Sequence, residues 1–190
     1  PNGVYDLGET VLTQVSANNV SLIGQSMEGV VIKNAPDAVN ESINNTATLL
    51  LTGNNIYLQD LTLQNALDYY KANNGRAVAL WDKGTHTICK NVRLLSYQDT
   101  YYSNKIGAVR YFEGGEIHGT VDYICGDGSV FFEDVLLYCE KRSSTGGGSD
   151  VITASNADQN DKGYVFNRCR IQSECPVVSF GRAWNNAPQC

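Results

Sequence analysis

The 190-residue sequence lacks the features that mark a membrane, nucleic-acid or metal protein. It has no apolar run near the roughly 20 residues that a membrane-spanning helix needs, so no membrane span is expected. Its 14 Lys and Arg stand against 20 Asp and Glu, and they form no basic cluster, so no nucleic-acid partner is expected. With two histidines and no C-x-x-C pair, the chain offers no usual zinc site, and we expect no cofactor.

Several catalytic and helical patterns are also missing. The chain has no G-x-S-x-G and no H-E-x-x-H motif, which disfavours a serine or zinc hydrolase. The Gly/Ser run at 143–149 lacks the Gly-Lys-Ser/Thr ending of a phosphate loop. His86 and His118 lie in turn-like contexts, and no segment has a convincing helical pattern. The remaining pattern is that of a β-protein with many turns.

The six cysteines are too few for a disulfide framework in a domain of this size. Four of them lie on or next to apolar runs and are interpreted as small buried hydrophobic residues: Cys89, Cys125, Cys139 and Cys169. Cys175 and Cys190 lie in polar contexts and are more suited to disulfides, with partners that the spacing does not identify.

The apolar runs repeat along the chain. The segment 56–65 aligns with 87–96, and the shape recurs at 112–117, 131–137 and 165–171. Each unit has an apolar residue, a polar pair and then alternating positions. The equivalent positions, which recur at similar but unequal intervals, are Asp60, Asn91, Gly114, Asp134 and Arg168.

A period of about 22 residues with insertions, built from strands, predicts an all-β fold, a right-handed parallel β-helix. We expect one domain over residues 1–190, with some terminal coils missing. A sandwich or barrel is the alternative, although Asn-Gly hairpin signals are scarce. The long insertions at 68–75 and 141–161 are expected to form loops on the stack.

Asp99 and Asp122 are the candidate catalytic pair. Asp122 follows Asp99 by the same interval at which the repeat position Gly114 follows Asn91. Stacked coils lie roughly 4.8 Å apart, so the two carboxylates should lie one above the other. Two carboxyl groups at such a short distance do not both ionise readily, so one pKa should be raised and the other should stay low. The pair would then consist of an acid beside a base or nucleophile.

Other polar and aromatic side chains are available near this pair. Gln98 offers an amide donor for an oxyanion, and Arg182 offers a guanidinium that would hold a carboxylate ionised. Four aromatic residues are candidates for stacking on sugar rings, with core packing the alternative for each: Tyr101, Tyr102, Tyr123 and Trp184.

These motifs resemble those of the pectin methylesterases, or pectinesterases, secreted carbohydrate esterases on a right-handed parallel β-helix. Gln98-Asp99-Thr100 matches the family's QDT, and the segment 119–126 is similar to its GTVDFIFG. Gly181-Arg182-Ala183-Trp184 is similar to GRPW, and 76–80 occupies the place of QAVAL. The four motifs occur in the family's order between positions 76 and 184.

The resemblance implies demethylation of galacturonate methyl esters in pectin, without a metal. By resemblance, Asp122 would be the nucleophile, Asp99 the acid and base, and Gln98 an oxyanion donor. Arg182 would orient Asp122, and Trp184 would line the subsite. The implied partner is methyl-esterified homogalacturonan, acted on by a monomer in a secreted or periplasmic location.

The sequence departs from the family pattern at several positions. The first residue of QAVAL, an oxyanion-hole glutamine in the family, is Arg76 here, so that donor is replaced or missing and an acidic neighbouring sugar would be favoured. Cys125 replaces a Phe and Ala183 a Pro, as packing changes. Residues 3–5 resemble the family's early GxYxE motif without its acid, and the chain ends soon after Trp184. We therefore expect a fragment, a divergent short form or one piece of a larger chain.

Two other functions share these features. A retaining glycosidase also needs two carboxylates about 5 Å apart. The signatures of polygalacturonases and the calcium-binding carboxylates of pectate lyases are not found. A non-catalytic polysaccharide-binding β-helix would be consistent with Arg76 and with the short ends, whereas Gln98, Asp99, Asp122 and Arg182 favour catalysis.

Overall fold

A computed structural model describes residues 1–37, 39, 41–71 and 75–184. In these ranges the chain forms strands, turns and loops, and no helix, hence none that could cross a membrane. The strands are β1 (Gly3–Asp6), β2 (Thr13–Val15), β3 (Ser21–Ile23), β4 (Val30–Asn34), β5 (Leu49–Leu51), β6 (Ile56–Asn65), β7 (Leu80–Asp82), β8 (His86–Leu95), β9 (Tyr101–Ser103), β10 (Val109–Glu113), β11 (Glu116–Gly119), β12 (Val121–Gly126), β13 (Ser129–Glu133), β14 (Leu136–Cys139), β15 (Ser149–Ser155), β16 (Tyr164–Asn167), β17 (Arg170–Ser173) and β18 (Val177–Ala183).

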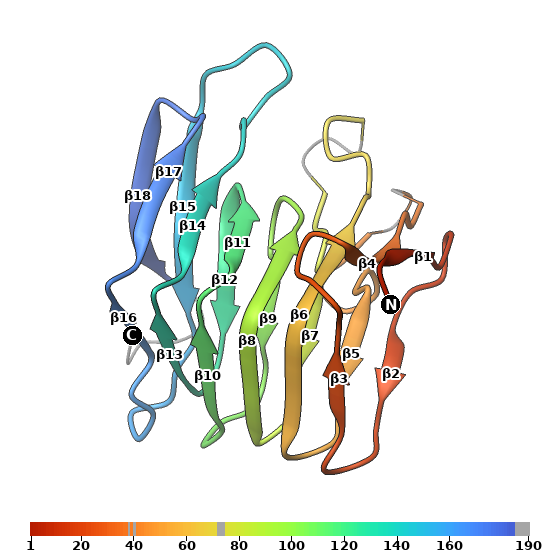
Figure 1. Cartoon of the computed structure of the whole chain (residues 1–190). Helices are drawn as coiled ribbons and strands as arrows, with labels where there is room; N and C mark the ends of the chain where they lie inside the picture. Colours follow the sequence, from red (N-terminus) through yellow and green to blue (C-terminus); the bar gives the residue numbers. More distant parts are fainter. Residues whose placement is uncertain (38, 40, 72–74, 185–190) are drawn as a thin grey trace.

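The strands stack coil upon coil into two sheets (Figure 1). One sheet follows the order β1-β4-β6-β8-β10-β13-β16, with β3, β11, β14 and β17 paired beside this path. The other follows β18-β15-β12-β9-β7-β5-β2. The pairs within these sheets are parallel, as in β6 with β8 and β12 with β15. The predicted parallel β-helix is confirmed, and a sandwich or barrel of hairpins is wrong.

The repeat positions found in the sequence form a row of sharp corners between strands. All five have a left-handed backbone: Asp60 (φ 52°), Asn91 (50°), Gly114 (65°), Asp134 (55°) and Arg168 (52°). Glycine and short polar residues tolerate this conformation best, which explains the residue types at most of these corners. Arg168 is the exception, and its guanidinium donates two hydrogen bonds of 2.9 and 2.7 Å to Asp134.

The core is a set of columns of identical or similar side chains, one per coil. Phe112, Phe132 and Phe166 occupy one register position, with ring centroids 5.1 and 4.7 Å apart. These spacings match the separation of parallel strands, so each ring lies on the ring of the coil below. Because inward residues of the middle coils are buried by their neighbours above and below, stability depends on continuous stacking rather than on one central cluster.

One ion pair lies inside the stack. Arg110 and Asp82 are both fully buried, with 3.1 Å between Nε and Oδ2. Arg110 also donates to the carbonyls of Asp82 and Gly84 at 3.1 Å and to that of Asp127 at 3.3 Å. These bonds tie the coil of β7 to the next coils, and they satisfy a charge that would otherwise be costly to bury.

The cysteine predictions are partly confirmed. Cys89, Cys125 and Cys139 are buried, whereas Cys169 is partly exposed but packs against the core. Cys175 is buried and forms no disulfide within the described part of the chain. Cys190 lies outside the described residues.

The insertion predicted at 141–161 is not one loop, because it contains β15. Most residues of this strand are buried or partly buried, and they pair with β12 and β18. The loops before β15 and after β6 both project at the upper end of the stack in Figure 1.

Candidate active site

Asp99 and Asp122 lie on consecutive coils, as the spacing predicts. Tyr101 follows Asp99 by two residues, Ile124 follows Asp122 by two residues, and the two are paired in register. The Asp99 amide donates to the Val121 carbonyl at 3.2 Å. Both aspartates have the left-handed backbone of a corner, with φ values of 61° and 53°. Each is 6% exposed. The two carboxyl groups are therefore stacked in a largely buried position, on backbone that only a few residue types adopt without strain.

Asp122 lies at an irregularity of β12. Toward β15 the register shifts between Val121 and Ile124, so Asp122 and Tyr123 together face a single residue. Such a bulge redirects the side chain of the bulged strand. Arg182 of β18 meets this carboxylate with both prongs of its guanidinium: Nε donates to Oδ1 at 2.8 Å, and Nη2 donates to Oδ2.

The surroundings give the two aspartates different charge states. Burial, and then the negative charge of Asp122, raise the pKa of Asp99 to about 8. Arg76 and Arg182 oppose this rise without cancelling it. A bidentate guanidinium is the partner of a carboxylate, so Asp122 is the charged member of the pair. The site thus holds a protonated acid beside a carboxylate at neutral pH.

Gln98 and Arg76 lie beside the aspartates on neighbouring coils. Their backbones form a parallel bridge, and the Ala77 amide donates to the Gln98 carbonyl at 2.9 Å. The Arg76 side chain is paired with Glu41, 3.3 Å from Nη1 to Oε1, and the Arg76 amide donates to the same oxygen at 3.2 Å. Arg76 therefore brings a second guanidinium to the site, partly neutralised by a carboxylate that the sequence did not point to.

These groups share one pocket of about 270 Å³. It is lined by Ile43, Arg76, Gln98, Asp99, Asp122, Cys125, Ala154, Arg182 and Trp184. Cys125, Ala154 and Arg182 follow one another in register on three successive strands. Cys125 and Ala154 have small side chains, which leaves room for the longer Arg182 side chain to reach Asp122.

The structure corrects two of the predicted substrate contacts. Tyr101 and Tyr123 are both fully buried in the hydrophobic core and do not line the pocket. Successive residues of a strand point to opposite faces, and these two point inward. Tyr102 points to the outer face, where its ring stacks on Trp81 at 5.5 Å and lies 6.2 Å from Trp184.

Four residues of the site were not predicted there: Glu41, through its bond to Arg76, and the pocket-lining residues Ile43, Cys125 and Ala154. Glu41 and Ile43 precede β5, outside the repeat units that we aligned. Ala154 belongs to β15, the strand that was interpreted as a loop. Its register with Cys125 is the signal that would have found it.

Comparisons with known proteins identify relatives of this chain. The family model described as Pectinesterase matches residues 1–186. Pectinesterase A of Dickeya dadantii is 30% identical over 212 residues, covering 97% of this chain and 56% of its own length. The probable pectinesterase/pectinesterase inhibitor 19 of Arabidopsis thaliana is 29% identical and covers 96% of this chain. The chain spans 35% of that relative's length, so it corresponds to part of these proteins.

A solved structure has the same architecture. Pectin methylesterase PemA from Erwinia chrysanthemi superposes with a TM-score of 0.83 at 27% identity, covering 96% of this chain and 60% of its own. The likeness extends over nearly all of the described coils.

Proposed function

The chain belongs to the pectinesterase family, and from this premise we propose that it is a carboxylic ester hydrolase that removes methyl groups from methyl-esterified galacturonate in pectin. Asp122 is the proposed nucleophile and Asp99 the proposed acid and base. The proposal needs no metal. We also propose that the chain acts on methyl-esterified homogalacturonan as a monomer, in a secreted or periplasmic location.

One observation carries the proposal. Within one pocket, Asp122 is held by both prongs of Arg182, while the pKa of its stacked neighbour Asp99 is raised to about 8. Ester cleavage by a carboxylate needs these two states together, since the nucleophile must be charged and the leaving methoxide must receive a proton. Two side chains of the same type thus take opposite protonation states.

The first step forms an acyl-enzyme. A carboxylate oxygen of Asp122 attacks the ester carbonyl carbon, and the carbonyl oxygen becomes an oxyanion. The Gln98 side chain, which lines the same pocket, donates to this oxyanion. When the oxyanion collapses, the bond to the methoxy group breaks, and Asp99 transfers its proton to the leaving oxygen. Methanol departs, and Asp122 is joined to the galacturonate as an anhydride.

The second step restores the enzyme. Asp99, now a carboxylate, removes a proton from a water molecule that attacks the galacturonyl carbon of the anhydride. The bond to Asp122 breaks, which releases the free acid and regenerates the Asp122 carboxylate beside Arg182. Asp99 is protonated again. The sum is one ester and one water converted to one acid and one methanol, with no other reactant.

Arg76 and Trp184 are proposed to bind the sugar chain around the reacting ester. Both line the pocket, and the Trp184 ring lies beside Tyr102 at its edge. A flat aromatic side chain suits a pyranose face. The Arg76 side chain is half exposed, so an acidic neighbouring galacturonate would exchange with Glu41 as its ion-pair partner.

The test is to incubate the chain with highly methylated pectin and to measure both methanol and new reducing ends. The proposal expects methanol release without reducing ends. New reducing ends would instead assign the carboxylate pair to a retaining glycosidase. A folded chain that binds pectin but releases neither product would be a non-catalytic polysaccharide-binding β-helix.

A further inference from the structure

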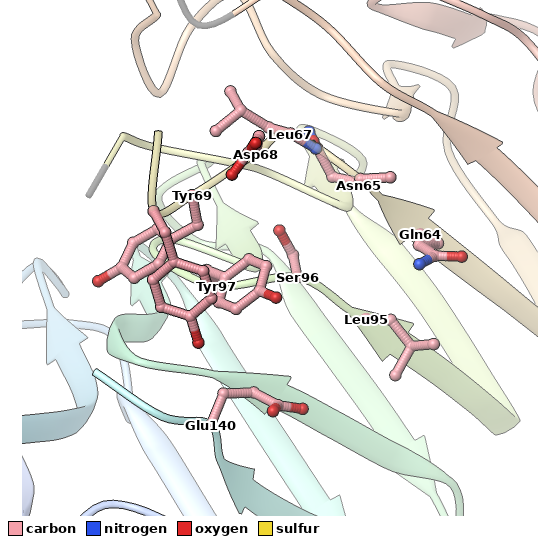
Figure 2. A pocket seen from close by; sticks show the side chains of 11 residues that line it. Gln64, Asn65, Leu67, Asp68, Tyr69, Leu95, Ser96, Tyr97 and Glu140 are labelled. Atoms are coloured by element: carbon pink, nitrogen blue, oxygen red, sulfur yellow. The ribbon is translucent and has the colours of Figure 1, made fainter. Parts of the chain in front are cut away.

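A second and larger cavity lies outside the catalytic pocket, with a volume of about 470 Å³ (Figure 2). It forms where β6 and β8 end, and the loop after β6 makes one of its walls. Its lining residues are Gln64, Asn65, Ala66, Leu67, Asp68, Tyr69, Tyr70, Leu95, Ser96, Tyr97 and Glu140. Figure 2 shows Tyr69 and Tyr97 on one side and Gln64 and Leu95 on the other. None of these residues has a part in the proposed ester hydrolysis.

Three tyrosines form the aromatic wall of this cavity. The rings of Tyr69 and Tyr97 are stacked at 4.6 Å and nearly parallel, and the ring of Tyr70 lies edge-on to both at 5.5 and 5.6 Å. Tyr69 is buried, whereas Tyr70 is 40% exposed. The cluster therefore presents aromatic surface at the cavity while its inner ring is fixed by packing.

Hydrogen bonds between the two insertion loops fix the walls of the cavity. The Tyr70 hydroxyl donates to the Lys141 carbonyl at 3.1 Å. The Tyr69 hydroxyl accepts hydrogen bonds from Arg142 and, at 3.1 Å, from Thr120. A preformed site loses less conformational entropy when a ligand binds.

The charged residues that line the cavity are acids, and the nearby Arg142 contacts its wall through Tyr69. Asp68 and Glu140 are its acids, and no Lys or Arg is among the described residues that line it. The Glu140 carboxylate lies 2.9 Å from Nδ1 of His118, which holds it in place. Burial first, and then the neighbouring Tyr70 and Glu140, raise the pKa of Tyr97. Its protonated hydroxyl can donate a hydrogen bond, as any tyrosine can at neutral pH. Amide, carboxylate and phenol groups beside aromatic rings suit the hydroxyls and the faces of an uncharged sugar.

We propose that this cavity is a second carbohydrate site, which binds an uncharged pyranose of pectin through the tyrosine wall and excludes the free galacturonate that de-esterification produces. The identity of the polymer rests on the proposed function. The uncharged pyranose is either a methyl-esterified galacturonate or a neutral side-chain sugar.

The two pockets are adjacent in the chain, which gives the second site a role. Tyr97 lines the cavity, and the next residue, Gln98, lines the catalytic pocket. Thr120, two residues before Asp122, bonds to Tyr69. A methylated stretch held at the cavity would keep esters near the aspartates, and the hold would weaken as the stretch loses its methyl groups.

The test titrates the Asp122→Asn chain, which lacks the proposed nucleophile, with three hexasaccharides: fully methylated oligogalacturonate, unesterified oligogalacturonate and a neutral galactan fragment. Backbone amide NMR signals of residues 95–97 and 140 report the cavity. Tyr70→Ala should weaken binding at these signals by about 3- to 10-fold. Tyr5→Ala, which removes a ring of similar exposure on β1, should leave the affinity measured at these signals unchanged.

A second variant tests the charge argument. Glu140→Gln should increase the affinity of the cavity for the unesterified hexasaccharide, because one of the two acids is removed. Binding of the methylated or the galactan ligand supports the proposal and identifies the sugar. The proposal is overturned if the cavity with Glu140 intact binds the unesterified hexasaccharide as tightly as the methylated one. It is also overturned if no ligand shifts the NMR signals of the cavity.

The two proposals fail separately. If methanol is released but the cavity signals do not move, the second site is wrong and the esterase stands. If the cavity binds but no methanol appears, the esterase is wrong.

Discussion

The raised pKa of Asp99 makes a prediction about stability as well as about catalysis. In the folded chain the carboxyl group keeps its proton up to about pH 8, whereas in the unfolded chain it loses the proton near pH 4. Between these values the unfolded state binds fewer protons, so the free energy of unfolding falls as the pH rises. The loss is complete above pH 8 and absent below pH 4.

The size of this effect follows from the pKa. At 1.36 kcal/mol per pH unit, an interval of about four units corresponds to at most roughly 5 kcal/mol. Asp99→Asn removes the titration and keeps a residue type that tolerates the φ of 61°. We therefore expect the thermal midpoint of the variant to exceed that of the parent increasingly from pH 4 to pH 8. For a chain of this size each kcal/mol corresponds to about 2–4 °C.

The assay is thermal denaturation of both chains at half-unit steps from pH 4 to pH 9. The same proton controls acylation, so methanol release by the parent should fall above about pH 8 after subtraction of the alkaline blank. Midpoint curves that stay parallel over the whole range would refute the assignment of the raised pKa to Asp99.

Three further predictions concern single contacts. Arg182→Lys keeps the charge but loses the fork that holds Asp122, so kcat for methanol release should fall on the order of 10²-fold with an unchanged thermal midpoint; a parental kcat would contradict this. Asp82→Asn leaves Arg110 buried without its counter-charge, so urea denaturation should show a loss of about 3–5 kcal/mol, and a loss below about 1 kcal/mol would be inconsistent with a buried pair. Asn91→Val should destabilise the chain by about 1–3 kcal/mol more than Asn91→Gly, because valine disfavours φ near 50°; both variants lose the bond to Asp60, so equal midpoints would count against corner strain.

Much of the fold follows from the local pattern of the sequence. The corners at Asp60, Asn91 and Asp134 can be recognised because short polar residues tolerate a left-handed backbone. On either side of each corner, alternating apolar and polar residues indicate which side chains point inward and which point outward. The stacking of Asp99 on Asp122 depends only on this period, so the interval between them in the sequence was enough to predict it.

Contacts between different repeats were not predictable in the same way. The pairs Arg110–Asp82 and Arg76–Glu41 join residues that do not share a repeat position. The burial of Tyr101 and Tyr123 depended on which face of the strand they occupy, because both faces of β9 and β12 are largely covered. The tyrosine cavity required the loops after β6 and β14 to meet, and loop contacts leave no periodic signal.

The most direct measurement of the central claim compares methanol release from highly methylated pectin by the parent chain and by Asp122→Asn. Both chains should show the same strand content by circular dichroism and the same affinity for a methylated oligosaccharide. The proposed mechanism predicts methanol from the parent and a rate lower by on the order of 10³-fold or more from the variant, since the nucleophile is gone. Comparable rates from the two folded chains would contradict an aspartate nucleophile at position 122.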